Sequence, residues 1–217
     1  MPSGGVFADI GSGTGIFSEQ LLKCGYRVFA VEPNDDMRKI AERKLNESPH
    51  FTSIKGTADN TTLLNGSIDC VTAAQAFHWF DAESFKKECR RILKPEGRII
   101  IVYNSRDDQA ECNLALAEIY KKYCLDFRGF SNGINAEKCC DFFGGKCEIF
   151  CVENAQRYSR QGYIKRVLSS SYSLQESDIR FAEYIEDVGR AFDTFAEDGV
   201  LKVPLHTKAY IGFCKDI

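Results

Sequence analysis

The first half of the chain alternates short apolar runs with longer amphipathic stretches. Apolar runs of strand length, bounded by glycine or polar residues, occur at 5–10, 26–31, 51–56, 67–74 and 97–103. Between them, apolar residues recur with helical spacing at 14–24, 35–47 and 81–93. Strands that alternate with helices favour a parallel sheet, because each helix returns the chain to the same end of the sheet. We therefore predict an α/β fold.

The second half has a weaker pattern. Helical spacing appears near 112–126 and 178–196, and strand-like runs lie near 147–158 and 201–214. The chain has 217 residues, of which 44% are hydrophobic, and a chain of this size can bury one sizeable core. We expect residues 1–217 to form a single domain.

A glycine-rich segment, DIGSGTG from Asp9 to Gly15, follows the first apolar run directly. Glycine lets backbone N–H groups approach a ligand closely, and the following helix turns its positive dipole end towards it. The dinucleotide fingerprint G-x-G-x-x-G requires its third glycine where this chain has Ile16, so the match to that fingerprint is poor. The carboxylate of Asp9 repels a pyrophosphate and favours a cationic ligand.

The second apolar run ends in Glu32, which is the position where an acidic residue can accept hydrogen bonds from both hydroxyls of a ribose. The glycine-rich turn and this acidic residue together predict an adenosine-bearing ligand at the carboxyl ends of the strands.

Two motifs carry a resemblance to a known family. Asp9, Gly11, Gly13 and Gly15 form a D-x-G-x-G-x-G pattern that resembles motif I of class I S-adenosylmethionine-dependent methyltransferases. The string AAQAFHWFD at 73–81 resembles the small-molecule branch, which includes methyltransferase type 11 and trans-aconitate methyltransferase-like proteins. The resemblance is good over residues 5–105 only.

The resemblance implies a Rossmann-like, doubly wound sheet of about seven strands, mostly parallel with an antiparallel last strand. It makes 5–105 the cofactor half, and 106–217 the acceptor-binding and edge-strand half. The implied cofactor is S-adenosylmethionine, with Asp9 near its ammonium group, Gly11 and Gly13 beside the methionine moiety, and Glu32 on the ribose. The other implied contacts are Gly15 in the turn, Pro33 and Met37 beside adenine, Ala58 and Asp59 at its edge, and Gln75 and Ala76 near the methyl group. Met37 fits a core position equally well.

The acceptor residues are less constrained by the sequence. His78 is a candidate base or hydrogen-bond partner for the acceptor, and its alternative role is that of a packed residue beside Trp79. Arg106 is a candidate partner for an acceptor carboxylate, and its alternative is a surface salt bridge. We expect a small acceptor with a carboxylate or hydroxyl group; a carboxylate needs no general base.

Two other function classes remain open. The chain could bind S-adenosylmethionine without catalysis, or it could be a nicotinamide-dependent oxidoreductase on a related sheet, which the glycine spacing and Asp9 disfavour. A net charge of −3 gives no electrostatic footprint for nucleic acid, and no apolar run reaches the length of a membrane span. We expect a cytoplasmic protein with a small-molecule partner, and no oligomeric state is indicated.

The ten cysteines lack the spacing of a metal site. Cys147, Ile149 and Cys151 alternate along the strand expected at 147–158, so we predict that they share one buried face. We expect no bound metal.

Family members resembling this chain carry a helical segment before the first strand that closes over the cofactor, whereas only Met1 to Gly4 precede Gly5 here. We therefore expect a modest affinity for the cofactor, because closure adds contacts and excludes water.

Overall fold

The structure is a computed structural model that describes residues 4–130 and 136–217. Its contacts divide the chain into two compact units. The first unit contains Met1–Tyr103, Ile134–Phe150 and Lys208–Ile217, and the second contains Asn104–Gly133 and Cys151–Thr207. The first division falls close to the boundary expected at residue 105, but the sequence did not indicate that two later segments return to the first unit.

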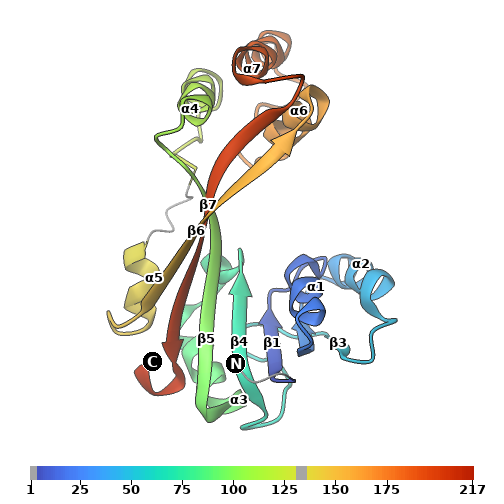
Figure 1. The fold of residues 1–217 in the computed structure, drawn as a ribbon, viewed down its shortest axis with the longest axis vertical. Helices are drawn as coiled ribbons and strands as arrows, with labels where there is room; N and C mark the ends of the chain where they lie inside the picture. Colours follow the sequence, from blue (N-terminus) through green and yellow to red (C-terminus); the bar gives the residue numbers. More distant parts are fainter. Residues whose placement is uncertain (1–3, 131–135) are drawn as a thin grey trace. The chain divides into compact units, whose positions relative to one another are not determined.

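The strands form one seven-stranded sheet in the order β3-β2-β1-β4-β5-β7-β6. Their bounds are β1 Val6–Ile10, β2 Arg27–Val31, β3 Phe51–Ile54, β4 Ile68–Ala74, β5 Leu93–Arg106, β6 Glu148–Tyr158 and β7 Leu201–Phe213. The first five strands in this order pair in parallel, and the last strands are antiparallel (Figure 1). This confirms the predicted α/β, Rossmann-like sheet.

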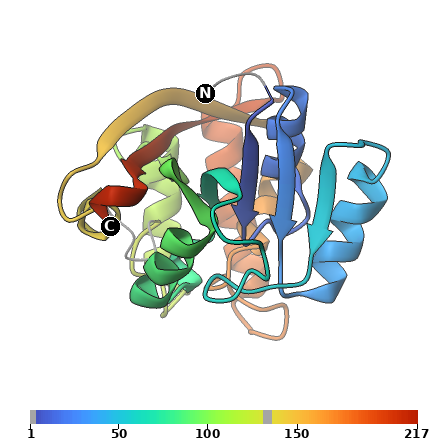
Figure 2. The ribbon, with the colours of Figure 1, turned by 90° about the horizontal axis from the view of Figure 1, so that it is seen from below.

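Helices cover both faces of the sheet in the first unit. Its helical elements are α1 Ile16–Lys23, α2 Asp35–Leu45, η1 Phe77–Trp79, α3 Ala82–Ile92, α5 Ala136–Phe142 and η2 Cys214–Asp216. Adjacent residues of β1 point to opposite faces, so Phe7 packs with Leu21 of α1 while Ala8 belongs to a core with Phe85 of α3. Figure 2 shows α2 lying along β3 on one side of the sheet.

The fifth strand begins earlier than expected. The sequence predicts a strand over 97–103, but β5 already starts at Leu93. The register explains the difference, because Ile68 pairs with Leu93 while Cys70 pairs with Arg98. Between these two pairs, β5 has three more residues than β4. The extra residues form an irregularity in the ladder of hydrogen bonds.

The second unit contains α4 Glu111–Tyr123, α6 Arg160–Leu168 and α7 Phe181–Phe195, together with the adjoining parts of three strands. Its core is aromatic, with Tyr120, Tyr163 and Tyr184 almost fully buried beside Leu116 and Val188. The sequence indicated α4 and α7, but not α6 or α5 of the first unit.

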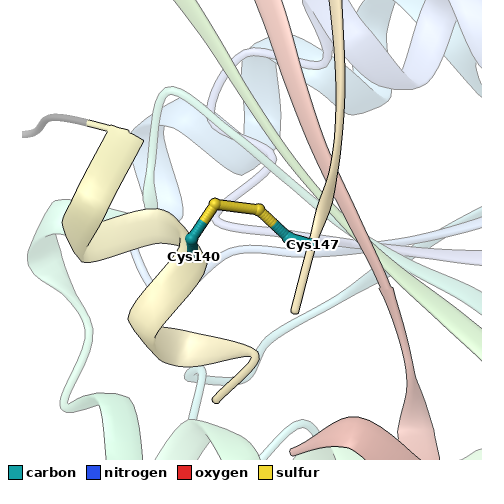
Figure 3. Close-up of a disulfide and its surroundings, with 2 residues drawn as sticks. All are labelled: Cys140 and Cys147. Carbon is teal, nitrogen blue, oxygen red and sulfur yellow. A yellow bond between two sulfur atoms is a disulfide. The ribbon is translucent and has the colours of Figure 1, made fainter. Parts of the chain in front are cut away.

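The prediction of a buried face shared by Cys147, Ile149 and Cys151 is wrong. Ile149 is 51% exposed and Cys151 is exposed, because β6 is an edge strand without a buried residue. Cys147 forms a disulfide with Cys140 of α5, seven residues earlier in the chain (Figure 3). Alternation identifies a strand, but it does not show whether another layer covers that strand.

Candidate functional site

The turn after β1 is built on three glycines in the left-handed region, with φ of +68° at Gly11, +56° at Gly13 and +79° at Gly15. L side chains rarely adopt this conformation. The backbone N–H groups of Gly11 and Ser12 both donate to the carbonyl of Val31, at 2.9 and 3.2 Å. The glycine-rich turn is therefore tied directly to the end of β2.

The three glycines have different surroundings. A Cβ on Gly11 would lie 2.6 Å from the Cβ of Ala76, and a Cβ on Gly15 would lie 2.8 Å from Leu45 of α2. A Cβ on Gly13 would meet no atom within 4 Å. The missing side chains of Gly11 and Gly15 thus let neighbouring residues of the protein pack closely against the turn, whereas Gly13 faces open space.

Glu32 holds this turn in place. Its carboxylate accepts hydrogen bonds from the backbone N–H of Gly13 and of Asn34, both at 2.9 Å, and the residue is only 6% exposed. Asn34 in turn caps α2, because its side-chain oxygen accepts from the N–H groups of Asp36 and Met37. A carboxylate has about four lone-pair sites, so each oxygen of Glu32 keeps capacity for a ligand hydroxyl.

A pocket of about 360 Å³ lies at the carboxyl ends of these strands. Its lining includes four residues that the sequence identified, namely Gly11, Pro33, Ala58 and Asp59. The sequence did not identify the other lining residues, which are Gly56, Thr57, Trp79, Phe80, Asp81 and Ser84. These residues lie in or near the segments that follow β3 and β4. That position near the strand ends was the only signal in the sequence that could have pointed to them.

The wall of the pocket after β3 offers unused polar groups. Thr57 and Asn60 pair through reciprocal backbone hydrogen bonds of 3.0 and 3.3 Å, which close a tight turn. Within the described residues, the N–H groups of Ala58 and Asp59 and the exposed carboxylate of Asp59 make no hydrogen bond or ion pair. One edge of the pocket thus carries both donors and an acceptor, and these groups fit the edge of an adenine.

The segment after β4 contributes Trp79, Phe80 and Asp81 to the same pocket. Gln75 is exposed with a φ of +58°, and its N–H donates to the carbonyl of Val102 at 2.9 Å. Ala76 is buried against Gly11, and Phe77 of η1 packs 5.0 Å from the ring of Phe142. These contacts fix η1, which presents His78 and the 80% exposed Trp79 at the surface.

His78 contacts one polar group on the neighbouring strand. Its backbone N–H donates to the hydroxyl of Tyr103 at 2.9 Å, and its Nδ1 lies 3.2 Å from the same oxygen. Partial burial lowers the pKa of His78, so the imidazole is neutral at neutral pH.

Asp9 lies beneath the turn and does not line the pocket. It is 1% exposed, and its carboxylate accepts hydrogen bonds from the hydroxyls of Ser18 at 2.6 Å and Thr72 at 3.0 Å. Its pKa is raised to about 6, chiefly by burial; the hydrogen bonds from the two hydroxyls oppose this shift, and the nearby charge of Glu32 adds to it.

Replacing Asp9 by asparagine should remove a pH dependence of stability. In the unfolded chain the carboxyl titrates near its ordinary pKa of 3.8, whereas in the folded state it titrates at about 6. The folded state therefore holds a proton that the unfolded state has lost in this window, and stability falls by about 3 kcal/mol as the pH rises through it. Urea denaturation of both proteins at about pH 4 and about pH 7.5 measures the difference.

In that comparison the stability of Asp9→Asn relative to the wild type should increase between the two pH values. All other groups titrate in both proteins, so they cancel in the difference. An equal difference at both pH values would show that Asp9 keeps an ordinary pKa in the folded protein.

The structure narrows the alternatives for two further candidates. Met37 is 45% exposed, so its alternative core position is excluded, and it lies in the first turn of α2 after Pro33. Arg106 belongs to the second unit, where its Nη1 donates to the Oδ1 of Asn113 at 2.8 Å and its guanidinium lies 4.8 Å from the ring centre of Phe130. The predicted alternative of a salt bridge for Arg106 is not formed with any described carboxylate.

The arrangement around Arg106 is rigid. Asn113 is 1% exposed, and its amide nitrogen donates to the carbonyls of Asp107 and Pro204 at 2.8 and 3.0 Å. This fixes the amide oxygen that receives the hydrogen bond from Arg106. Most of the five N–H groups of the guanidinium thus remain available within the described part of the chain.

Residues 4–130 and 136–217 contain no group of three or more histidine, cysteine or acidic side chains that could hold a metal ion. Across those same residues, no helix has the length and apolar character that crossing a membrane requires.

Comparisons with known proteins agree with this geometry. Residues 8–101 match the family described as a methyltransferase domain. An uncharacterized methyltransferase of Mycobacterium tuberculosis is 36% identical over 111 residues, which are 51% of this chain and 44% of that protein. An uncharacterized methyltransferase-like protein of Schizosaccharomyces pombe is 31% identical over 126 residues, which are 58% of this chain and 48% of that protein. The chain thus spans just under half the length of these curated relatives.

Two solved structures share the fold over nearly the whole chain. A protein of Anaeromyxobacter dehalogenans, assigned provisionally as a type II methyltransferase, gives a TM-score of 0.72 at 21% identity and covers 98% of this chain and 91% of its own. Phosphoethanolamine N-methyltransferase 2 of Haemonchus contortus, solved with phosphomonomethylethanolamine and S-adenosylhomocysteine, gives a TM-score of 0.54 at 16% identity. The match covers 98% of this chain and 49% of the Haemonchus contortus chain.

The strand order and the glycine-rich turn after β1 define the fold of the class I S-adenosylmethionine-dependent methyltransferases. Residues 8–101 match the methyltransferase-domain family, and the sheet has the fold of the solved methyltransferases.

Proposed function

We propose that the chain binds S-adenosylmethionine in the pocket of the first unit and transfers its methyl group to a small-molecule acceptor. The observation that carries the proposal is the combination of an open space above Gly13 with unused hydrogen-bonding groups at Ala58 and Asp59. Ala58 and Asp59 line the strand-end pocket, and Gly13 lies in the same turn as the lining residue Gly11. Neither the open space nor the unused groups serve the packing of the protein itself.

The adenine edge is the best match for the wall after β3. The N–H of Ala58 can donate to a ring nitrogen, and the carboxylate of Asp59 can accept from an exocyclic amine. Pro33, which also lines the pocket, offers an apolar surface for the ring. These roles use the groups that have no other partner in the described structure.

Glu32 is suited to the ribose. Its charge lies almost fully buried beside the turn, so hydrogen bonds to it are charge-assisted. Because Gly13 and Asn34 already fix both oxygens, the acceptor atoms are in place before a ligand arrives. Little entropy is then lost in ordering them on binding.

The methionine end of the ligand carries positive charge, and two buried carboxylates favour it. Asp9 and Glu32 are both less than a tenth exposed, and they lie at the ends of neighbouring strands. When bound, S-adenosylmethionine supplies a methyl group activated by a sulfonium. The acidic residues favour such a cation over a pyrophosphate through Coulomb interaction at low effective dielectric.

Arg106 is our candidate partner for an anionic group of the acceptor. Its guanidinium is held by Asn113 and Phe130, and within the described residues no carboxylate neutralises it. A planar, positioned guanidinium with free N–H groups binds carboxylates in a bidentate manner. We therefore favour acceptors with a carboxylate.

The test of the function has two stages. Calorimetric titration with S-adenosylhomocysteine and, separately, with NADH should show binding of the first and none of the second. Incubation with labelled S-adenosylmethionine and a set of small carboxylic and hydroxy acids should then label one class of product. Binding without any labelled product would support the alternative of a cofactor-binding protein, and binding of NADH alone would overturn the proposal.

Arg106→Lys should raise the KM for a carboxylate acceptor by about tenfold, because lysine cannot reproduce the planar fork. The dissociation constant of S-adenosylhomocysteine should not change, since Arg106 belongs to the second unit and the cofactor pocket is lined by residues of the first. Steady-state kinetics measure the first quantity and calorimetry the second. Lys202→Arg on the exposed surface of the second unit is the matched control. Unchanged KM in Arg106→Lys would remove the residue from acceptor binding.

A further inference from the structure

The contact between Tyr103 and His78 constrains where the imidazole carries its proton. Tyr103 lies on β5 and is 8% exposed, while His78 belongs to η1 at the surface. The phenol oxygen has two hydrogen bonds within the described residues, and both are to His78, through the backbone N–H at 2.9 Å and through Nδ1 at 3.2 Å.

The direction of the hydrogen bond between Nδ1 and the phenol oxygen follows from the number of hydrogens that need an acceptor. The backbone N–H of His78 must donate, so it occupies one lone pair of the phenol oxygen. If Nδ1–H also donated, the phenol hydrogen would have no acceptor among the described residues, which is unfavourable for a mostly buried hydroxyl. The phenol O–H therefore donates to Nδ1, and the hydrogen of the neutral imidazole is on Nε2.

The protonation of both groups agrees with this arrangement. Burial raises the pKa of Tyr103 to about 12, so the phenol keeps the hydrogen that it donates. Partial burial lowers the pKa of His78, so the ring stays neutral and Nδ1 can accept.

We propose that Tyr103 is a positioning residue that holds His78 in the Nε2–H form, and that His78 acts on the acceptor as a hydrogen-bond donor instead of a general base. The part that concerns the acceptor rests on the proposed function. The ring of Trp79, which lines the pocket, is centred 4.7 Å from that of His78.

The donor role has a chemical consequence. In the transfer, a lone pair of the acceptor atom forms the new bond to the methyl carbon, and the electron pair of the broken carbon–sulfur bond stays on sulfur. No proton passes to His78 in this step, because Nε2 already carries one. Nε2–H can orient the acceptor through a hydrogen bond. Because no base takes a proton, the nucleophilic atom must be unprotonated when it binds, as a carboxylate oxygen is.

The tautomer can be measured without any acceptor. In protein labelled with ¹⁵N-histidine at neutral pH, the ring nitrogens of His78 should appear as a protonated Nε2 and an unprotonated Nδ1. Tyr103→Phe should shift both signals towards a mixture of tautomers, whereas Tyr26→Phe, which alters a tyrosine at the ring of Phe7, should leave them unchanged. A protonated Nδ1 in the wild type overturns the proposal.

Turnover tests the donor role separately. The amide of His78→Gln can donate from about the position of Nε2 but cannot act as a base, so it should retain at least about tenfold more turnover than His78→Ala. Tyr103→Phe should lower kcat and leave the binding of S-adenosylhomocysteine unchanged. Equal loss in His78→Gln and His78→Ala, with a pH profile that reports an essential base, overturns the donor role.

If no acceptor is labelled, the proposed function fails while the NMR result still decides the positioning by Tyr103. The two failures are therefore distinguishable.

Discussion

Glu32→Ala should weaken the binding of S-adenosylhomocysteine by about 1.5–3 kcal/mol, which is about 10- to 150-fold in the dissociation constant. Two losses combine in this variant. The ribose loses a buried charged acceptor, and the N–H groups of Gly13 and Asn34 lose the partner that fixes the turn beside the ligand. Calorimetry measures the affinity, and thermal unfolding shows whether the variant remains folded.

Two further variants separate these losses. Glu32→Gln keeps one oxygen for a backbone N–H but removes the charge, so its affinity should lie between those of the wild type and Glu32→Ala. Glu47→Ala removes an exposed carboxylate that follows α2, and it should bind as the wild type does. A wild-type dissociation constant for Glu32→Ala would place the ribose elsewhere.

The same substitution at Gly11 and at Gly13 should give opposite results. Both residues have a left-handed backbone, so alanine costs about 1–2 kcal/mol of stability at either position. At Gly11 the new Cβ also lies 2.6 Å from Ala76, and this overpacking adds about 1–3 kcal/mol. At Gly13 it enters open space and should instead obstruct the ligand.

We therefore expect Gly11→Ala to be strongly destabilised, by about 2–5 kcal/mol in total. Gly13→Ala should lose only the backbone cost of about 1–2 kcal/mol but bind S-adenosylhomocysteine about 5- to 150-fold more weakly. Urea denaturation and calorimetry on both variants test the pair. Normal binding by a folded Gly13→Ala protein would show that no ligand approaches this turn.

The parts of the site that follow one strand and one turn could be predicted from the sequence. The glycines and Glu32 depend on neighbours within a few residues, and local rules describe such neighbours well. The same holds for Ala58 and Asp59, whose place after β3 was enough to bring them to the pocket.

The burial of Asp9 could not be predicted in this way. Its carboxylate is satisfied by Ser18 on α1 and by Thr72 on β4, and Thr72 lies 63 residues away in the chain. Such a pair depends on the register between β1 and β4, which a hydrophobic pattern does not specify.

The second unit was the least predictable part of the chain. Helix α7 was indicated because its buried Tyr184, Val188 and Phe192 recur every four residues. The nine-residue α6 buries only Tyr163 and Val167, which are too few to reveal a helical period. The early start of β5 and the uncovered edge strand β6 likewise depend on which strand lies beside which, and that is decided by tertiary packing.

Trp79 gives this protein a built-in optical reporter. It is the single tryptophan of the chain, it is 80% exposed, and it lines the pocket beside Phe80. An indole that passes from water into contact with a ligand emits at shorter wavelength, and no second indole masks that shift. Intrinsic fluorescence of the unlabelled protein therefore reads the occupancy of this one pocket, and it can follow every titration of the Glu32 and Gly13 variants.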